Sequence, residues 1–217
     1  GYSHYVDFIR DRIAGKPVIQ NGMKGEVERC LSALEAALAG QNVCMVCSGD
    51  PGILAMAGLL YELRTREPRF RDIPIRVLPG ITAATIAASS LGAPLQNGFS
   101  LVSLSDLLVS ANEVRRNIRS VAQSLLPVAL YNPAGRKRRA LLDETLAVFR
   151  EHRGRDVLCA YVKNAGREQE TKWVGKLSEF PAAEVDMSTL IIIGGSRTRL
   201  DSGVLYEPRG YVEKYME

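Results

Sequence analysis

An acidic residue and two glycines stand in one tight loop between two apolar runs, and this loop carries the strongest chemical signal in the sequence. Residues 43–47 are apolar and lead into Ser48-Gly49-Asp50-Pro51-Gly52, after which apolar residues recur at helical spacing from 53 to 63. The order predicts a strand, a turn and a helix. Asp50 then lies at the carboxyl end of the strand, where open α/β sheets bind ligands. Glycine lets the backbone approach a ligand, although an ordinary strand-to-helix turn accounts for the same residues equally well.

Strand-like stretches that run into small or turn-forming residues recur along the chain, at 75–78, 127–131, 157–162 and 190–193. The residues that come after them are Pro79-Gly80-Ile81-Thr82, Asn132-Pro133, Lys163-Asn164-Ala165-Gly166 and Gly194-Gly195-Ser196. Loops of this kind converge on one pocket when their strands share a sheet. The sequence therefore predicts a ligand site built from five loops.

Taken together, these loops resemble the tetrapyrrole methylases, over essentially the whole chain. The segments that carry the resemblance are Gly49-Asp50-Pro51-Gly52, Leu78-Pro79-Gly80-Ile81-Thr82-Ala83, Ser103-Leu104-Ser105-Asp106-Leu107-Leu108, Leu130-Tyr131-Asn132-Pro133, Asn164-Ala165-Gly166-Arg167-Glu168 and Pro208-Arg209-Gly210-Tyr211. The first two are widespread in that family. The third and the last two resemble the branch that methylates precorrin-3B at carbon 17 and contracts its ring to precorrin-4, in cobalamin biosynthesis.

The resemblance implies a fold of two α/β domains with a cofactor cleft between them, and a homodimer. We place the boundary near 123–127, which divides the chain into an N-terminal α/β domain, 1–124, and a more strand-rich C-terminal α/β domain, 125–217. Helices are expected at 2–14, 25–38, 53–63, 79–91, 113–124 and 141–152, and further strands at 16–19, 99–103 and 170–175. Family members open with a strand, a glycine-rich loop and a helix. The first residues of this sequence resemble the segment directly after that opening unit, so we expect one βα unit of about 30 residues to be absent.

Composition excludes several classes of function. The chain has 217 residues, 46% of them hydrophobic, and a formal net charge of +4. No apolar run approaches the roughly 20 residues of a membrane span, and no signal-peptide pattern opens the chain, so we expect a cytoplasmic protein with no membrane partner. The basic run at 136–139 is not interleaved with aromatic residues, which disfavours nucleic acid as a partner.

Cysteine spacing does not favour a metal site. Cys44 and Cys47 form a C-x-x-C pair, but on a strand residues three apart point to opposite faces. We predict that these two, together with Cys30 and Cys159, are core thiols, and that the protein binds no metal.

The resemblance implies S-adenosylmethionine as cofactor and S-adenosylhomocysteine as its product. Cofactor contacts carry over to Gly49, Asp50, Ile53, Thr82, Ala83, Tyr131, Asn132, Ala165, Ser188 and Thr189. A structural role alone is the alternative at each of them; Thr82, for example, suits a helix N-cap and Asn132 a turn.

Methyl transfer from a sulfonium mainly requires alignment and exclusion of water, whereas ring contraction also requires proton movement. Asp106 and Arg167 are therefore the candidate catalytic residues, with a helix N-cap as the alternative role of Asp106. Candidate substrate contacts are Ser105, Arg136, Lys137 and Glu168, because a precorrin carries acetate and propionate carboxylates that cations and polar groups can pair. The alternatives to the precorrin-3B enzyme are its cobalt-containing counterpart, another precorrin methylase such as the C11 enzyme, and a non-catalytic cofactor-binding protein.

Overall fold

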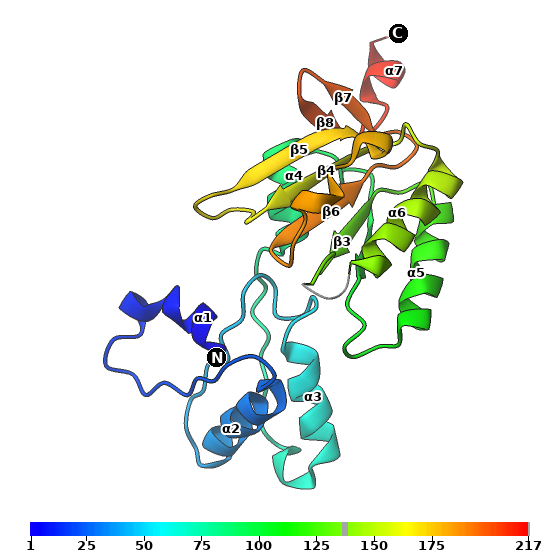
Figure 1. Ribbon diagram of the computed structural model, residues 1–217. Coiled ribbons are helices and arrows are strands. Elements are labelled where there is room, and N and C mark those ends of the chain that lie inside the picture. The colour runs from blue at the N-terminus through cyan, green and yellow to red at the C-terminus, as the bar shows by residue number, and fades with distance from the viewer. Residues whose placement is uncertain (136–138, 217) are drawn as a thin grey trace. The chain divides into compact units, whose positions relative to one another are not determined.

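The structure is a computed structural model that describes residues 1–135 and 139–216. It divides into two compact units, Gly1–Thr82 and Ala83–Glu217 (Figure 1). The described residues form helices and two sheets, so the predicted α/β class is confirmed. The division between the units falls inside the predicted N-terminal domain, and the domain boundary at 124/125 stays a prediction.

The first unit is mainly helical. Its elements are α1 (Ser3–Asp7), η1 (Arg10–Arg12), α2 (Glu26–Leu38), α3 (Ala57–Arg66) and η2 (Pro68–Phe70). Cys30 and Leu34 lie one helical turn apart on α2 and pack with Leu63 of α3 and with Phe70, which forms the core of the unit. The predicted helix at 53–63 begins only at Ala57, because Leu54 has a φ of 53°, outside the helical range.

Three predicted strands of the first unit, at 16–19, 43–47 and 75–78, are wrong. A strand is defined by backbone pairing with a neighbour, and the described part of this unit shows only one isolated bridge, between Tyr2 and Asn21. The prediction of core thiols changes with them, since Cys44 is exposed and Cys47 only half-buried. Cys30 and Cys159 are buried as predicted.

The second unit contains the main sheet, with strand order β2-β3-β6-β4-β5. The strands are β2 (Ser100–Ser103), β3 (Val128–Tyr131), β4 (Leu158–Lys163), β5 (Thr171–Lys176) and β6 (Thr189–Ile193), which confirms the five predicted there to within one or two residues at each end. β2 and β3 are parallel, whereas β6 is antiparallel to both β3 and β4, and β5 is antiparallel to β4. The carboxyl ends of β2, β3 and β4 therefore share one edge with the amino ends of β5 and β6. We call this the loop edge.

Helices cover both faces of the main sheet. On one face, α4 (Ala83–Leu91) places Ala84, Ala87 and Ala88 against small and branched residues of β3, β4 and β6. On the other face, α5 (Ala111–Gln123) and α6 (Ala140–Arg153) lie side by side (Figure 1) and bury Ile118, Leu142, Leu146 and Phe149. The sheet is thus a rigid layer whose edges are open to loops.

The fifth predicted loop does not join the others. Because β6 runs antiparallel to β4, its carboxyl end lies at the opposite edge, where the Gly194 N–H donates to the Leu158 carbonyl at 2.8 Å. Residues 194–196 are therefore far from the loop edge, and only the residues before β6 reach it. A second sheet, not predicted, has the order β1-β8-β7, from β1 (Gly92–Ala93), β7 (Arg199–Asp201) and β8 (Val204–Tyr206). The short elements η3 (Leu177–Glu179), η4 (Ala182–Glu184) and α7 (Tyr211–Tyr215) complete the unit.

Candidate functional site

In the first unit, Asp50 joins two of the loops that the sequence singled out. Its Oδ1 accepts the N–H of Gly52 at 2.8 Å, and its Oδ2 accepts the N–H of Gly80 at 3.0 Å. One carboxylate therefore closes its own loop and also attaches the loop that begins at Pro79. Hydrogen bonds with a charged acceptor are stronger than neutral ones, so Asp50 organises both loops.

Glycine is required where these loops meet. Gly49 has a φ of 74°, in the left-handed region. A Cβ added at Gly80 would strike the backbone carbonyl oxygen of Gly49, a group that cannot rotate away as a side chain could. Thr82 is buried directly after this contact. The predicted cofactor residues Gly49, Asp50 and Thr82 thus belong to one closely packed pair of loops.

Large apolar side chains are exposed on the same pair of loops. Ile53 and Leu54 follow Asp50, and Leu78 and Ile81 flank Gly80, and these four side chains are between 37% and 68% exposed. Apolar surface beside a fixed carboxylate and closely packed backbone suits a ligand that combines a flat apolar ring with polar groups. These features match the requirements of a nucleoside, so the loops fit the adenosyl part of the cofactor that the resemblance implies.

In the second unit, the third predicted loop is tied to its neighbours at the loop edge. The Tyr131 hydroxyl accepts the N–H of Ala84, in the first turn of α4, at 2.7 Å. Asn132 has a φ of 51°, and its Nδ2 donates to Ser103 Oγ at 3.0 Å. The same Ser103 Oγ accepts the N–H of Ser105 at 3.2 Å. The loops after β2 and β3 are therefore fixed to each other.

A carboxylate missed by the sequence reasoning holds Ser188 and Thr189 in place. Asp186 Oδ1 accepts the Ser188 N–H at 2.9 Å and the Thr189 hydroxyl at 3.1 Å, and Oδ2 pairs with Lys163 Nζ at 2.5 Å. Burial opposes ionisation of Asp186, but these donors together hold its pKa below the usual value. An aspartate two residues before the N–H that it accepts is an Asx-turn signal, which the sequence does contain.

Glu170 plays a similar part for the fourth loop, and it was missed as well. Its Oε2 accepts the Gly166 N–H at 2.6 Å, and its Oε1 accepts the Ser90 hydroxyl of α4 at 2.5 Å. Hydrogen bonds from Ser90 and Gly166 lower the pKa of Glu170. Ala165, a predicted cofactor residue, packs against the core beneath α4. The fourth loop is thereby fastened to the helix that covers the sheet.

The candidate catalytic residues are exposed at the loop edge. Asp106 follows Ser105, and Arg167 and Glu168 lie in the loop after β4. The proposed alternative role of Asp106 as a helix N-cap is wrong: no helix begins there, and the N-cap of α5 is Ser110, whose Oγ accepts the Glu113 N–H at 3.2 Å. The candidate substrate residues Arg136 and Lys137 lie outside the described residues.

The structure thus assembles the predicted residues in two groups. Within the first unit it brings together Gly49, Asp50, Ile53 and Thr82. At the loop edge of the second unit it places Ala83, Ser105, Asp106, Tyr131, Asn132, Ala165, Arg167, Glu168, Ser188 and Thr189.

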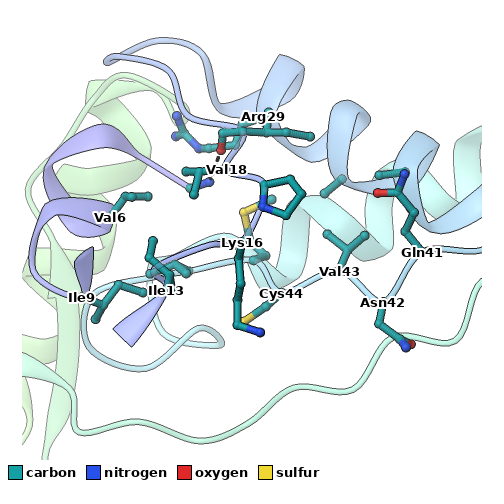
Figure 2. A pocket seen from close by; sticks show the side chains of 17 residues that line it. Val6, Ile9, Ile13, Lys16, Val18, Arg29, Gln41, Asn42, Val43 and Cys44 are labelled. Carbon is teal, nitrogen blue, oxygen red and sulfur yellow. Dashed lines mark hydrogen bonds between the residues drawn. The ribbon is translucent and has the colours of Figure 1, made fainter. Parts of the chain in front are cut away.

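A cavity of about 370 Å³ also lies in the first unit, and it shares no lining residue with the Asp50 loops. Val6, Ile9 and Ile13 line it from the α1–η1 segment, and Val43 and Cys44 from the segment after α2 (Figure 2). Within residues 1–135 and 139–216, no group of three or more His, Cys, Asp or Glu side chains is placed to hold a metal ion. No helix in this described part of the chain is long and apolar enough to cross a membrane.

Comparison with known proteins supplies the context for this arrangement. The family model described as Tetrapyrrole (Corrin/Porphyrin) Methylases matches residues 4–181. A Salmonella typhimurium protein named Probable cobalt-factor III C(17)-methyltransferase is 37% identical over 211 residues, covering 97% of this chain and 87% of that protein. A Sinorhizobium protein named Precorrin-3B C(17)-methyltransferase is 34% identical over 217 residues, covering 97% and 85%.

Among solved structures, the crystal structure of the methyltransferase CobJ matches with a TM-score of 0.89 and 32% identity, covering 96% of this chain and 87% of that one. Other relatives are longer, and this chain spans 47% and 59% of the length of two of them.

Proposed function

This chain belongs to the tetrapyrrole (corrin/porphyrin) methylase family, and from that premise we propose that it methylates carbon 17 of precorrin-3B, with ring contraction, in cobalamin biosynthesis. The observation that carries the proposal is the likeness, across 97% of the chain, to a protein named Precorrin-3B C(17)-methyltransferase. A second candidate substrate is cobalt-factor III, because the Salmonella typhimurium relative at 37% identity bears that name.

The methyl donor of this proposal is S-adenosylmethionine, whose sulfonium supplies the driving force for methyl transfer when it is bound. The protein's own contribution is to bind, orient and exclude water. In the first unit, the Asp50 and Gly80 loops present fixed backbone and exposed apolar side chains. At the loop edge, Tyr131, Asn132 and Thr189 are each held by hydrogen bonds within the protein, so their positions do not depend on a ligand.

Preorganised loops matter for this chemistry because a donor and an acceptor held in register react as if at very high concentration. Three carboxylates, those of Asp50, Glu170 and Asp186, each accept a backbone N–H from a loop that contains predicted cofactor residues. We propose that these carboxylates position the cofactor loops, with Ala165, Ser188 and Thr189 among the groups that they hold.

For the substrate, we propose that Asp106 and Arg167 assist ring contraction, with Ser105, Glu168, Arg136 and Lys137 contacting the carboxylate-bearing rim. The support is that four of these side chains, those of Ser105, Asp106, Arg167 and Glu168, lie at the loop edge. Asp106 also acts on Arg115 of α5, where the Glu144 hydrogen bond and then the charges of Glu144 and Asp106 raise the pKa of Arg115. An ionised carboxylate beside a cation suits a group that exchanges a proton during the reaction.

The decisive experiment incubates the full-length protein with S-adenosylmethionine and either precorrin-3B or cobalt-factor III, and follows product mass and absorbance spectrum. We expect one added methyl group and a contracted ring from one of the two substrates. Products methylated at another carbon would instead indicate another precorrin methylase, and binding of the cofactor without turnover would indicate a non-catalytic protein. Sedimentation of the same sample tests the homodimer that the resemblance implies.

The Asp106→Asn variant separates methyl transfer from contraction. We expect it to bind S-adenosylhomocysteine as the wild type does and to form contracted product about 10²-fold more slowly, the lower range for lost acid–base assistance. Because Asp106 caps no helix, the substitution has no structural reason to affect folding. Unchanged turnover at saturating substrate would exclude the role assigned to Asp106.

A further inference from the structure

Three consecutive apolar side chains in the second unit are exposed. Leu107 is 73%, Leu108 is 99% and Val109 is 41% exposed. We call residues 107–109 the apolar lip. An isolated exposed leucine requires no explanation, but a run of three in one short segment marks a surface that is covered in use.

The chain on both sides of the apolar lip is anchored, so its exposure is imposed by the fold. On one side, Leu104 is buried and its N–H donates to the Tyr131 carbonyl at 2.8 Å. On the other side, Ser110 caps α5 through the Glu113 N–H. The segment between Ser105 and Ser110 is a short bridge that cannot turn its side chains into the core, because both of its ends are already fixed.

The apolar lip is continuous with the loop edge. It begins four residues after Ser103, the carboxyl end of β2, and Ser103 Oγ accepts hydrogen bonds from both Asn132 and Ser105. Asp106 adjoins the lip, and its charge acts on Arg115. An apolar surface therefore stands directly beside polar and charged groups at one edge of the sheet.

We propose that the apolar lip binds a flat face of the tetrapyrrole ring system, and this rests on the proposed function. The conjugated ring is apolar across its faces and carries its carboxylates at the periphery, which is the same division of surface that the lip and its charged neighbours show. A second copy of the chain is a poorer occupant, because three side chains fall far short of the roughly 800 Å² per partner that a stable protein interface buries.

The test uses the full chain with Leu107→Ala and Leu108→Ala, and measures the affinity for precorrin-3B by fluorescence quenching and the affinity for S-adenosylhomocysteine by calorimetry. The matched control is Leu125→Ala: Leu125 is 72% exposed but precedes β3, at the edge opposite the loop edge. Burying a leucine side chain is worth enough for each lip variant to lose about 10-fold in precorrin affinity. We expect the control to match the wild type, and cofactor affinity to be the same in all variants.

Two further measurements keep the outcomes separate. Wild-type precorrin affinity in Leu108→Ala, or an equal loss in Leu125→Ala, would overturn the proposal, as would a change of oligomeric state in the lip variants without a loss of precorrin affinity. Leu108→Met, which retains the apolar bulk, should recover most of the affinity. If the wild-type protein neither binds nor methylates precorrin-3B or cobalt-factor III, then the proposed function itself has failed, which is a different result.

Discussion

Removing the carboxylate of Asp50 should weaken cofactor binding, because that side chain connects two loops of the first unit. Asp50→Asn keeps one oxygen acceptor but turns an NH₂ group toward a backbone N–H, so one of the two hydrogen bonds is lost. Asp50→Ala loses both. The site is partly open to water, and each such bond is worth about 1 kcal/mol. We therefore expect S-adenosylhomocysteine to bind about 5-fold more weakly to Asp50→Asn and about 30-fold more weakly to Asp50→Ala.

Isothermal titration calorimetry of the full-length protein measures these affinities, and Asp72→Asn is the matched control because Asp72 is an exposed carboxylate of the same unit. Thermal denaturation of each variant separates a local effect on the loops from a loss of folding. Equal affinity in Asp50→Ala and the wild type would refute the reasoning, since it would mean that the loops keep their binding arrangement without the carboxylate. A loss of the same size in Asp72→Asn would point to net charge as the cause.

Three further outcomes are expected from contacts of the same kind. Gly80→Ala should weaken binding of S-adenosylhomocysteine about 10-fold, because its Cβ would strike the carbonyl oxygen of Gly49; calorimetry checks this, and unchanged affinity would mean that the loops lie further apart. Asp186→Asn should lower the melting temperature at neutral pH. The pair with Lys163 stabilises the fold above the ordinary aspartate pKa of about 3.9 and is lost as pH falls through the lowered pKa of Asp186, so the two melting curves should converge in acid, and a constant difference would contradict the pairing. Arg153→Met should destabilise the protein by about 2–4 kcal/mol in urea denaturation, because the half-buried guanidinium donates to carbonyl oxygens of α5 and of the residue after β6; a loss near zero would show that water replaces these bonds.

Local pattern was sufficient for much of the second unit. The strands and the helices that cover them have apolar residues at periods that belong to one secondary structure only, and the structure has them within a few residues of the predicted bounds. The loop that contains Asp50 was likewise visible in the sequence, since a glycine-rich turn between apolar runs is a local signal. The family, too, could be inferred from short motifs along the chain, and the comparisons confirm it.

Strand formation and strand direction were not decided locally. Residues 43–47 and 75–78 have strand-like composition, yet they form no strand because a strand exists only with a hydrogen-bonded neighbour. Residues 194–196 were expected beside the other loops, but the antiparallel pairing of β6 sends them to the far edge. The sequence by itself determined which residues are loops and what chemistry they carry. Only the tertiary structure decided which loops meet and which carboxylates hold them, because contacts such as that of Ser90 with Glu170 join residues 80 positions apart.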